Sequence, residues 1–90
     1  MKDKKRMAEM SADLYDLLVS LDEVEKMKAL FADLCTDKEI EQMAQRLRAA
    51  KLLKDGKTYA QVIEETEISS ATLSRVSRCV QYGEGYSRFL

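Results

Sequence analysis

The sequence predicts an all-α protein of about five helices, and three observations support this fold class. The 90 residues include no proline and only three glycines, so few positions interrupt a helix. Leucine, methionine, alanine, lysine and glutamate, which favour helices, recur along the chain. Apolar residues also recur at spacings of three and four, as they do along one face of a helix. We therefore expect one domain of packed helices.

The N-terminal third predicts two amphipathic helices. The first carries an apolar face made of Met7, Met10, Leu14, Leu17, Leu18 and Leu21. Ser20 or Asp22 is the expected N-cap of the second, because both side chains can accept a hydrogen bond from a free backbone N–H. That helix carries Val24, Met27, Leu30, Phe31 and Leu34. With 46% apolar residues, the chain has more apolar side chains than one small interior holds, which indicates a partner surface such as a second copy.

The longest helix is predicted to follow. Thr36-Asp37-Lys38-Glu39 is a capping box, in which the threonine accepts from free N–H groups and the glutamate reaches back to the start of the helix. Asp55-Gly56 is expected to end this helix. Its inward residues are expected to be Ile40, Met43, Leu47, Ala50 and either Leu52 or Leu53.

The segment Thr58–Arg78 predicts a helix-turn-helix. Thr58 can cap a short helix to about Glu65, and Ser69 can cap a second helix to about Tyr82. Gly83 and Gly85 are expected to end the second helix, and the tail at residues 86–90 to dock on the body. The inward residues expected to lock the two helices together are Val62, Ile63, Ile68, Leu73 and Val76, with Cys79 joining this core.

The opposite face of the second helix predicts DNA binding. Residues 68–82 contain no acidic residue, although the chain is otherwise rich in them. Short side chains let a helix approach base edges in the major groove, and arginine can contact guanine or phosphate. We expect bases to be read by Ser69, Ser70, Ala71, Ser74 and Arg75, and phosphates to be held by Arg78, Thr58 and Lys57.

The charge distribution along the chain agrees with a DNA-binding surface in the C-terminal half. The first 44 residues carry seven Lys/Arg and eleven Asp/Glu, a net charge of −4. The remaining 46 carry eight Lys/Arg and five Asp/Glu, a net charge of +3. An acidic scaffold half and a mildly basic working half are indicated.

Two alternatives compete with DNA binding. Serine, threonine and arginine also occur on solvated helix faces of plain bundles, although such faces favour the better helix formers Glu, Lys and Gln. A protein-interaction module would use the helix-turn-helix surface or the acidic N-terminal helices instead. That alternative is favoured by a cluster of acidic residues at the end of the first helix of the pair, Glu64, Glu65 and Glu67.

The composition argues against an enzyme. Histidine is absent, which excludes a His-based triad and histidine metal ligands. Cys35 and Cys79 are too far apart in sequence for a zinc-finger or thioredoxin motif, and the acidic pairs lie among lysines as on solvated helices. We expect no catalytic residue, no metal site and no cofactor. With no apolar run long enough for a leader or a membrane span, we expect a cytoplasmic protein without a membrane partner.

Four strings stand out beyond the helix pattern: Gln45-Arg46-Leu47-Arg48, Leu52-Leu53-Lys54-Asp55-Gly56-Lys57-Thr58-Tyr59, Ala71-Thr72-Leu73-Ser74-Arg75-Val76 and Tyr82-Gly83-Glu84-Gly85-Tyr86. Together they resemble the Trp repressor superfamily, and within it the Trp-repressor-related YerC/YecD family, over roughly residues 10–90. The resemblance implies a Trp-repressor-like intertwined homodimer that regulates transcription at a palindromic operator. It implies dimerisation helices at 1–54, the helix-turn-helix at 58–82 and a C-terminal tail at 83–90.

The resemblance also implies a candidate ligand pocket. In the Trp repressor an effector's carboxylate and ring lie between two arginines, and the matching positions here are Arg46 and Arg75. Arg48 is expected on a solvated or ion-paired helix face instead. Val76 stands where the Trp repressor has a glycine that leaves room for an indole ring. We therefore expect tryptophan not to be the effector, and the identity of any effector stays open.

Glu67 is a second departure from the family pattern. Related helix-turn-helix sequences usually place glycine there, because the turn needs a positive φ. A glutamate in that conformation costs about 1 kcal/mol or more. Either the turn has a different shape, or the protein tolerates the strain.

Overall fold

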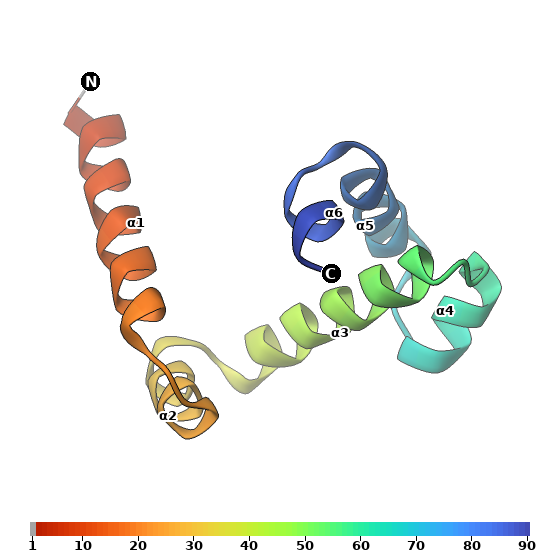
Figure 1. Ribbon diagram of the computed structural model, residues 1–90, viewed down its shortest axis with the longest axis horizontal. Helices are drawn as coiled ribbons and strands as arrows, with labels where there is room; N and C mark the ends of the chain where they lie inside the picture. Colours follow the sequence, from red (N-terminus) through yellow and green to blue (C-terminus); the bar gives the residue numbers. More distant parts are fainter. Residues whose placement is uncertain (1) are drawn as a thin grey trace. The chain divides into compact units, whose positions relative to one another are not determined.

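The computed structural model describes residues 2–90 as six α-helices, with no strand in that range (Figure 1). The helices are α1 (Lys2–Ser20), α2 (Val24–Leu34), α3 (Asp37–Lys54), α4 (Tyr59–Thr66), α5 (Ser70–Tyr82) and α6 (Gly85–Phe89). The predicted all-α class is confirmed, with one short helix more than expected. The described residues divide into two compact units, residues 2–36 and residues 37–90.

The break between α1 and α2 differs from the prediction in its cap. The N-cap of α2 is Glu23, and its side chain makes no capping hydrogen bond. Ser20 Oγ donates instead to the carbonyl of Leu17 at 2.6 Å, at the end of α1. Asp22 pairs with Lys26 one turn into α2, at 2.8 Å. Neither predicted cap residue therefore caps α2, because each side chain has a partner elsewhere.

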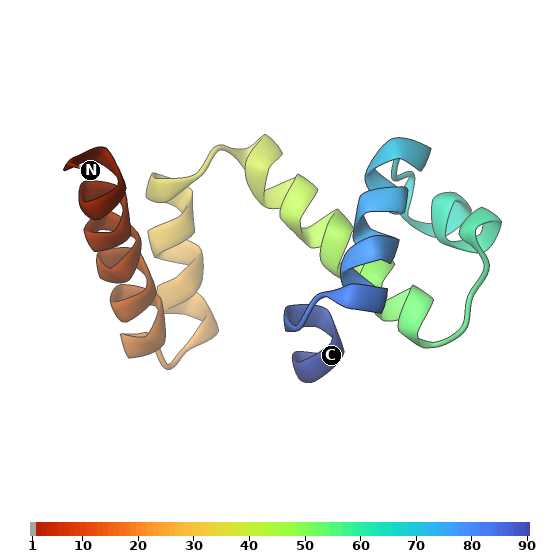
Figure 2. The same cartoon turned by 90° about the horizontal axis from the view of Figure 1, so that it is seen from above.

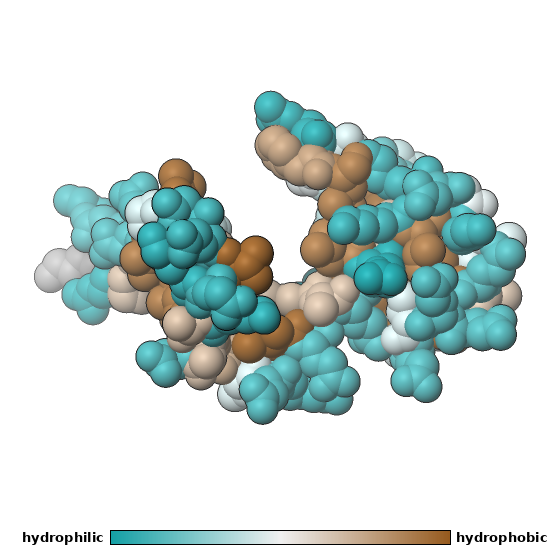
Figure 3. Space-filling view, turned by 60° about the horizontal axis from the view of Figure 1, so that its bottom comes forward, coloured by the Kyte–Doolittle hydropathy of each residue, from teal (hydrophilic) through white to brown (hydrophobic). Residues whose placement is uncertain are grey.

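The N-terminal unit leaves exposed many apolar residues of the two predicted amphipathic faces. No side chain between residues 3 and 36 is buried. Met7 is 57% exposed, Met10 52% and Leu17 46%, and apolar surface is visible on this unit at the left of Figure 3. The amphipathic pattern is therefore real, but two helices alone do not cover it.

Helix α3 begins directly after Thr36 and ends where Asp55-Gly56 predicted. Gly56 has φ +87°, a left-handed conformation that glycine adopts without steric cost. Its N–H donates to the carbonyl of Leu53 and the next N–H, of Lys57, donates to that of Leu52, which together form a Schellman motif.

The buried residues of α3 are the two small ones. Ala49 and Ala50 are fully buried, because their side chains let α4 and α5 pack closely against the second half of α3. Met43 and Leu47, which the periodicity placed inside, are 36% and 41% exposed. That expectation is wrong for the single chain, because α4 and α5 pack against the side of α3 that carries Ala49 and Ala50.

The helix-turn-helix core forms as predicted. Val62, Ile68, Leu73 and Val76 are buried together with the two alanines of α3, and Ile63 is half-buried beside them. Burying an aliphatic side chain of this size contributes about 1.5–3 kcal/mol, so these few residues supply much of the stability of the unit. Ser77, the one buried polar residue among those the structure describes, lies on the same side of α5.

The tail docks on the C-terminal unit, as predicted, and forms α6. Tyr86 packs against the core, and α6 lies beside the C-terminal end of α5 (Figure 2). Gly83 ends α5, but Gly85, also expected to end it, is the first residue of α6. Within residues 2–90, no helix is both long enough and apolar enough to cross a bilayer.

Candidate nucleic-acid interface

The start of α4 is fixed by a capping box between Thr58 and Gln61. The N–H of Gln61 donates to Thr58 Oγ1 at 3.2 Å, and the N–H of Thr58 donates to Gln61 Oε1 at 2.9 Å. Thr58 is therefore a structural cap, as predicted. Because a hydroxyl accepts and donates at once, its O–H proton remains able to donate to a phosphate. Lys57 precedes it in the loop and is exposed.

The turn between α4 and α5 keeps a left-handed residue, and that residue is Glu67. Its φ is 60° and its ψ is 20°, and its N–H donates to the carbonyl of Ile63 at 2.8 Å. Among the described residues it is the only non-glycine with positive φ. The protein thus retains the expected turn and tolerates the strain of a glutamate.

Thr66 anchors this turn from both sides. Its Oγ1 donates to the carbonyl of Val62 at 2.7 Å and accepts from the N–H of Ile68 at 3.3 Å. Gln45 of α3 donates through Nε2 to the carbonyl of Thr66 at 2.8 Å. The hydrogen bond from Gln45 ties the turn to α3 across 21 positions of sequence, and periodicity gives no sign of it.

Ser69 caps α5. Its Oγ accepts from the N–H of Thr72 at 3.2 Å, and the two side-chain hydroxyls lie 2.9 Å apart. The next N–H groups, those of Ser70 and Ala71, have no partner within the helix because they belong to its first turn. Such free N–H groups can bind an anionic oxygen.

The predicted base-reading residues gather on one exposed side of α5. Leu73, Val76 and Ser77 form the buried side of the helix. The exposed residues include the predicted Ser69, Ser70, Ala71, Ser74, Arg75 and Arg78. The predicted phosphate contacts divide between two places: Arg78 lies on α5, whereas Thr58 and Lys57 lie at the start of α4, the end of that helix far from the turn.

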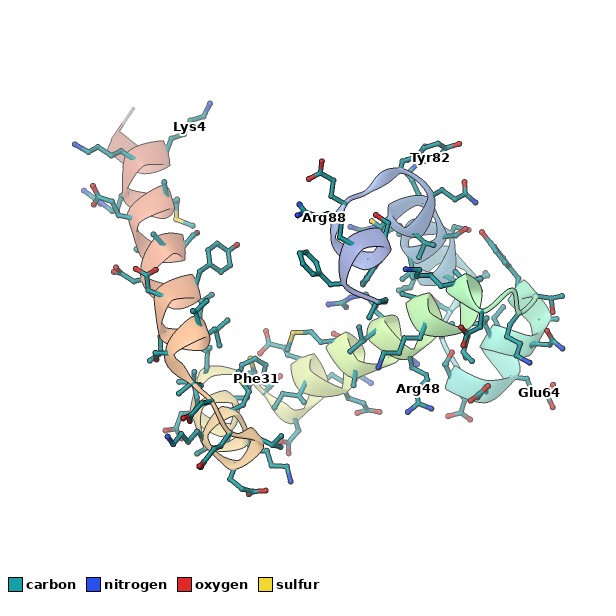
Figure 4. The ribbon with its side chains drawn as sticks, viewed as in Figure 1. Lys4, Phe31, Arg48, Glu64, Tyr82 and Arg88 are labelled. Atoms are coloured by element: carbon teal, nitrogen blue, oxygen red, sulfur yellow. The ribbon has the colours of Figure 1, made fainter. Side chains whose placement is uncertain are left out.

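The charges around this face differ between the two helices. No ion pair within residues 2–90 involves Arg75 or Arg78, so both guanidinium groups face solvent. Glu65 of α4 lies 3.9 Å from Arg48 of α3, which confirms the ion-paired position expected for Arg48. Figure 4 shows the Arg48 side chain projecting from α3. Both side chains are more than half exposed, so the pair contributes little to stability. Glu64 projects from α4.

A pocket of about 720 Å³ opens between α3 and α5. Arg46 and Arg75, assigned to a candidate ligand site by resemblance, both line it, and so does Val76. Glu67 adds an acidic group from the turn. The remaining lining residues are Lys38, Glu41, Gln42, Gln45, Ser69, Thr72, Cys79 and Tyr86.

Cys79 lies on the pocket wall and is exposed, which corrects its predicted place in the core. Val76 and Val80 are four residues apart and share the inner side of α5, whereas Cys79, one residue before Val80, is turned about 100° away from it. Both cysteines are free thiols.

Comparison with known proteins identifies similar sequences. A family model described as Trp repressor protein matches residues 9–90. YerC of Bacillus subtilis (strain 168), which is called uncharacterized, is 44% identical over 81 residues; the match covers 90% of this chain and 77% of YerC.

Two solved structures have a closely similar fold. A crystal structure from Staphylococcus aureus, provisionally named a Trp repressor, superposes with a TM-score of 0.86 at 39% sequence identity and covers 97% of this chain and 88% of its own. A TrpR-like protein from Eubacterium eligens ATCC 27750 superposes with a TM-score of 0.85 at 37% identity, covering 89% and 84%.

Proposed function

Because the chain belongs to the Trp repressor protein family, we propose that it is a homodimeric transcriptional regulator that binds a palindromic DNA operator. The observation that carries the proposal is the exposed side of α5. It contains two unpaired arginines and no acidic residue, and the turn and the buried core hold it in place.

In this mechanism α5 enters the major groove with its N-terminal end toward the bases. Ser69, Ser70, Ala71, Ser74 and Arg75 read base edges there. Arg78 holds a phosphate beside the groove, and Thr58 and Lys57 hold another at the start of α4. Because serine and alanine are short, the helix backbone can approach the bases closely.

A second copy of the chain would cover the apolar residues that a single chain leaves exposed. These lie on α1, α2 and α3: Met7, Met10, Leu14, Leu17, Val24, Leu34, Met43 and Leu47. Two recognition helices related by a two-fold axis would enter successive major grooves. The operator would then be a palindrome with half-sites about 10 base pairs apart. We place this activity in the cytoplasm.

The pocket between α3 and α5 is the proposed effector site. Arg46 and Arg75 provide cationic groups for an anionic part of a ligand, and Val76 provides an apolar surface. Val76 is 2% exposed. It stands where the Trp repressor has a glycine, so its branched side chain would occupy the space of an indole ring. We propose that the effector is not tryptophan, so that tryptophan at millimolar concentration leaves both the melting temperature and the DNA affinity unchanged.

The alternative function is a protein-interaction module. Glu64, Glu65 and Glu67 place three carboxylates at the end of α4 and in the turn, and carboxylates repel DNA phosphates. A partner protein with a basic surface would fit there. This function becomes the better one if the purified protein retains no duplex at low salt and captures one basic partner.

The test is selection from random duplex DNA by the purified protein, at low salt and again near physiological salt. We expect an enriched motif with two-fold symmetry, bound more weakly as salt rises because phosphate contacts release counterions. Motif-free retention that disappears at higher salt would contradict operator binding. No retention at either salt would contradict DNA binding altogether.

A pair of charge-matched variants assigns the contact. Arg75→Ala with Arg78→Ala removes the two arginines of α5, and Arg48→Ala with Arg88→Ala removes two exposed arginines elsewhere. We expect the first variant to lose at least about a hundredfold in operator affinity and the control only a few-fold, because base contacts are worth more than distant charge. Equal losses would show that only net charge matters.

A further inference from the structure

The tail that follows the recognition helix is held by one lysine of α3. Lys54 Nζ lies 2.6 Å from the main-chain oxygen of Leu90, 3.2 Å from that of Ser87 and 3.3 Å from that of Tyr86. An ammonium group has three N–H donors, so this contact uses all of them. Within residues 2–90, Lys54 forms no ion pair with an Asp or Glu side chain.

This contact supplies what α6 lacks. A helix of five residues is too short to be stable alone. The carbonyl of Tyr86 accepts from the N–H of Leu90, and the carbonyls that follow it have no partner within the helix. A cation that binds these carbonyls satisfies them and interacts favourably with the helix dipole. Lys54 is therefore in a position to decide whether α6 stays docked.

The link from α6 to the recognition helix is short. Only Gly83 and Glu84 separate α5 from α6, and Ser87 Oγ donates to the carbonyls of both, at 3.0 and 3.2 Å. Tyr86 is half-buried against the core beside Val80 of α5, and it also lines the pocket. A displacement of α6 would therefore be passed directly to the C-terminal end of α5.

The recognition helix is thus fixed to α3 at both ends. Gln45 holds the turn before α5 through the carbonyl of Thr66, and Lys54 holds the tail after α5 through three carbonyls. We infer that Lys54 is a positioning residue for DNA recognition. It holds α6 and Tyr86 in place, and so fixes the angle between the axes of α5 and α3. The inference rests on the proposed DNA-binding function.

The experiment uses three full-length variants. Lys54→Met keeps the length of the side chain and removes the ammonium, whereas Lys54→Arg keeps a donor-rich cation. Lys51→Met is the matched control, because it removes one exposed charge from the same helix, one turn away, at a residue that forms no ion pair in the described part of the chain. Affinity is measured for the selected operator and for a scrambled duplex, with amide hydrogen exchange of residues 83–90 and thermal unfolding.

We expect Lys54→Met to lose about tenfold in operator affinity, as the loss of charge-assisted hydrogen bonds predicts, and to speed exchange in residues 83–90. Its affinity for scrambled duplex should fall only as far as that of Lys51→Met, because both lose one charge. Lys54→Arg should retain operator affinity and slow exchange. Specific binding would then depend on the tail and not on charge alone.

Several outcomes would overturn the inference. Equal operator affinities for Lys54→Met and Lys51→Met would overturn it, because the tail would then not position α5. This holds whether or not amide exchange in residues 83–90 becomes faster. Equal losses on operator and scrambled duplex would also do so, since they would reduce Lys54 to a phosphate contact. If the unaltered protein binds no duplex, the proposed function fails first and the inference fails with it.

Discussion

Glu67 is the residue at which local backbone preference and tertiary structure disagree most. It adopts the left-handed conformation that the turn requires, and its carboxylate lies at the edge of the pocket lined by Arg46 and Arg75. The hydrogen bonds of Thr66 and the burial of Ile68 hold the turn in place despite the strain.

Glu67→Gly should therefore stabilise the protein. Glycine reaches a φ of 60° without the steric cost that glutamate bears, so we expect the free energy of unfolding to rise by about 1 kcal/mol. Urea unfolding followed by circular dichroism measures it. Glu64→Gly is the matched control, because Glu64 is exposed within α4 and glycine there should cost about 0.5–1 kcal/mol. A loss of stability in Glu67→Gly would show that the Glu67 side chain contributes more than the turn costs.

At the scale of the element, the exit from α5 depends on a close backbone approach. A Cβ added at Gly83 would lie 2.7 Å from the carbonyl oxygen of Cys79, a backbone atom that cannot move aside without disturbing α5. A Cβ at Gly85 would meet nothing within 4 Å. Close backbone packing therefore requires glycine at position 83, whereas no such contact requires it at position 85.

Gly83→Ala should destabilise the C-terminal unit by about 1–3 kcal/mol, as overpacking of a fixed site does. Gly85→Ala should be neutral or slightly stabilising, because Gly85 is the first residue of α6 and alanine favours helices. Thermal unfolding of the two variants side by side checks the contrast. Equal melting temperatures would mean that α5 adjusts its last turn freely.

The sequence predicts those elements whose signals are local. Thr58 and Ser69 mark the starts of α4 and α5 through their own side chains, and the apolar spacing of Leu73 and Val76 marks the buried side of α5. Helix α6 has no such signal, since its stability comes from Lys54, more than 30 residues earlier, bonding to main-chain oxygens that every sequence possesses. Hydrogen bonds to the backbone over such distances leave no pattern in the residue types.

The same limit applies to the candidate site. The exposed face of α5 follows from periodicity, because the residues that are not buried must face outward. The pocket does not, since it forms only where α3, the turn and the tail meet. Arg46 and Arg75 were assigned to it by family resemblance, and the structure brings both to its wall. Glu67, Gln45 and Tyr86 join them without any sequence signal.

At the scale of the whole molecule, the exposed apolar side of α1 predicts self-association. We expect the protein in solution to have twice the chain mass, 2 × 10.3 = 20.6 kDa, by sedimentation equilibrium. Leu17→Glu places a charge on the apolar side of α1 and should raise the dimer dissociation constant at least about tenfold, because burying an unpaired carboxylate is costly.

Val19→Glu is the control for this prediction. Val19 is also aliphatic and on α1, but it is 85% exposed and lies outside the apolar stripe, so this variant should remain dimeric. A mass of 10.3 kDa for the unaltered protein would contradict the dimer and with it the palindromic operator.

The absence of any buried side chain between residues 3 and 36 has a genetic consequence. In the proposed dimer, the subunits recognise each other mainly through α1 and α2, whereas the helix-turn-helix contacts DNA. A subunit that lacks Arg75 and Arg78 would still form a dimer with an intact subunit. That mixed dimer would have only one recognition helix able to bind DNA. If both copies are present in equal amounts and pair at random, about three quarters of the dimers would contain at least one inactive recognition helix. Such an allele should be dominant over the intact gene, whereas an allele that disrupts α1 should be recessive.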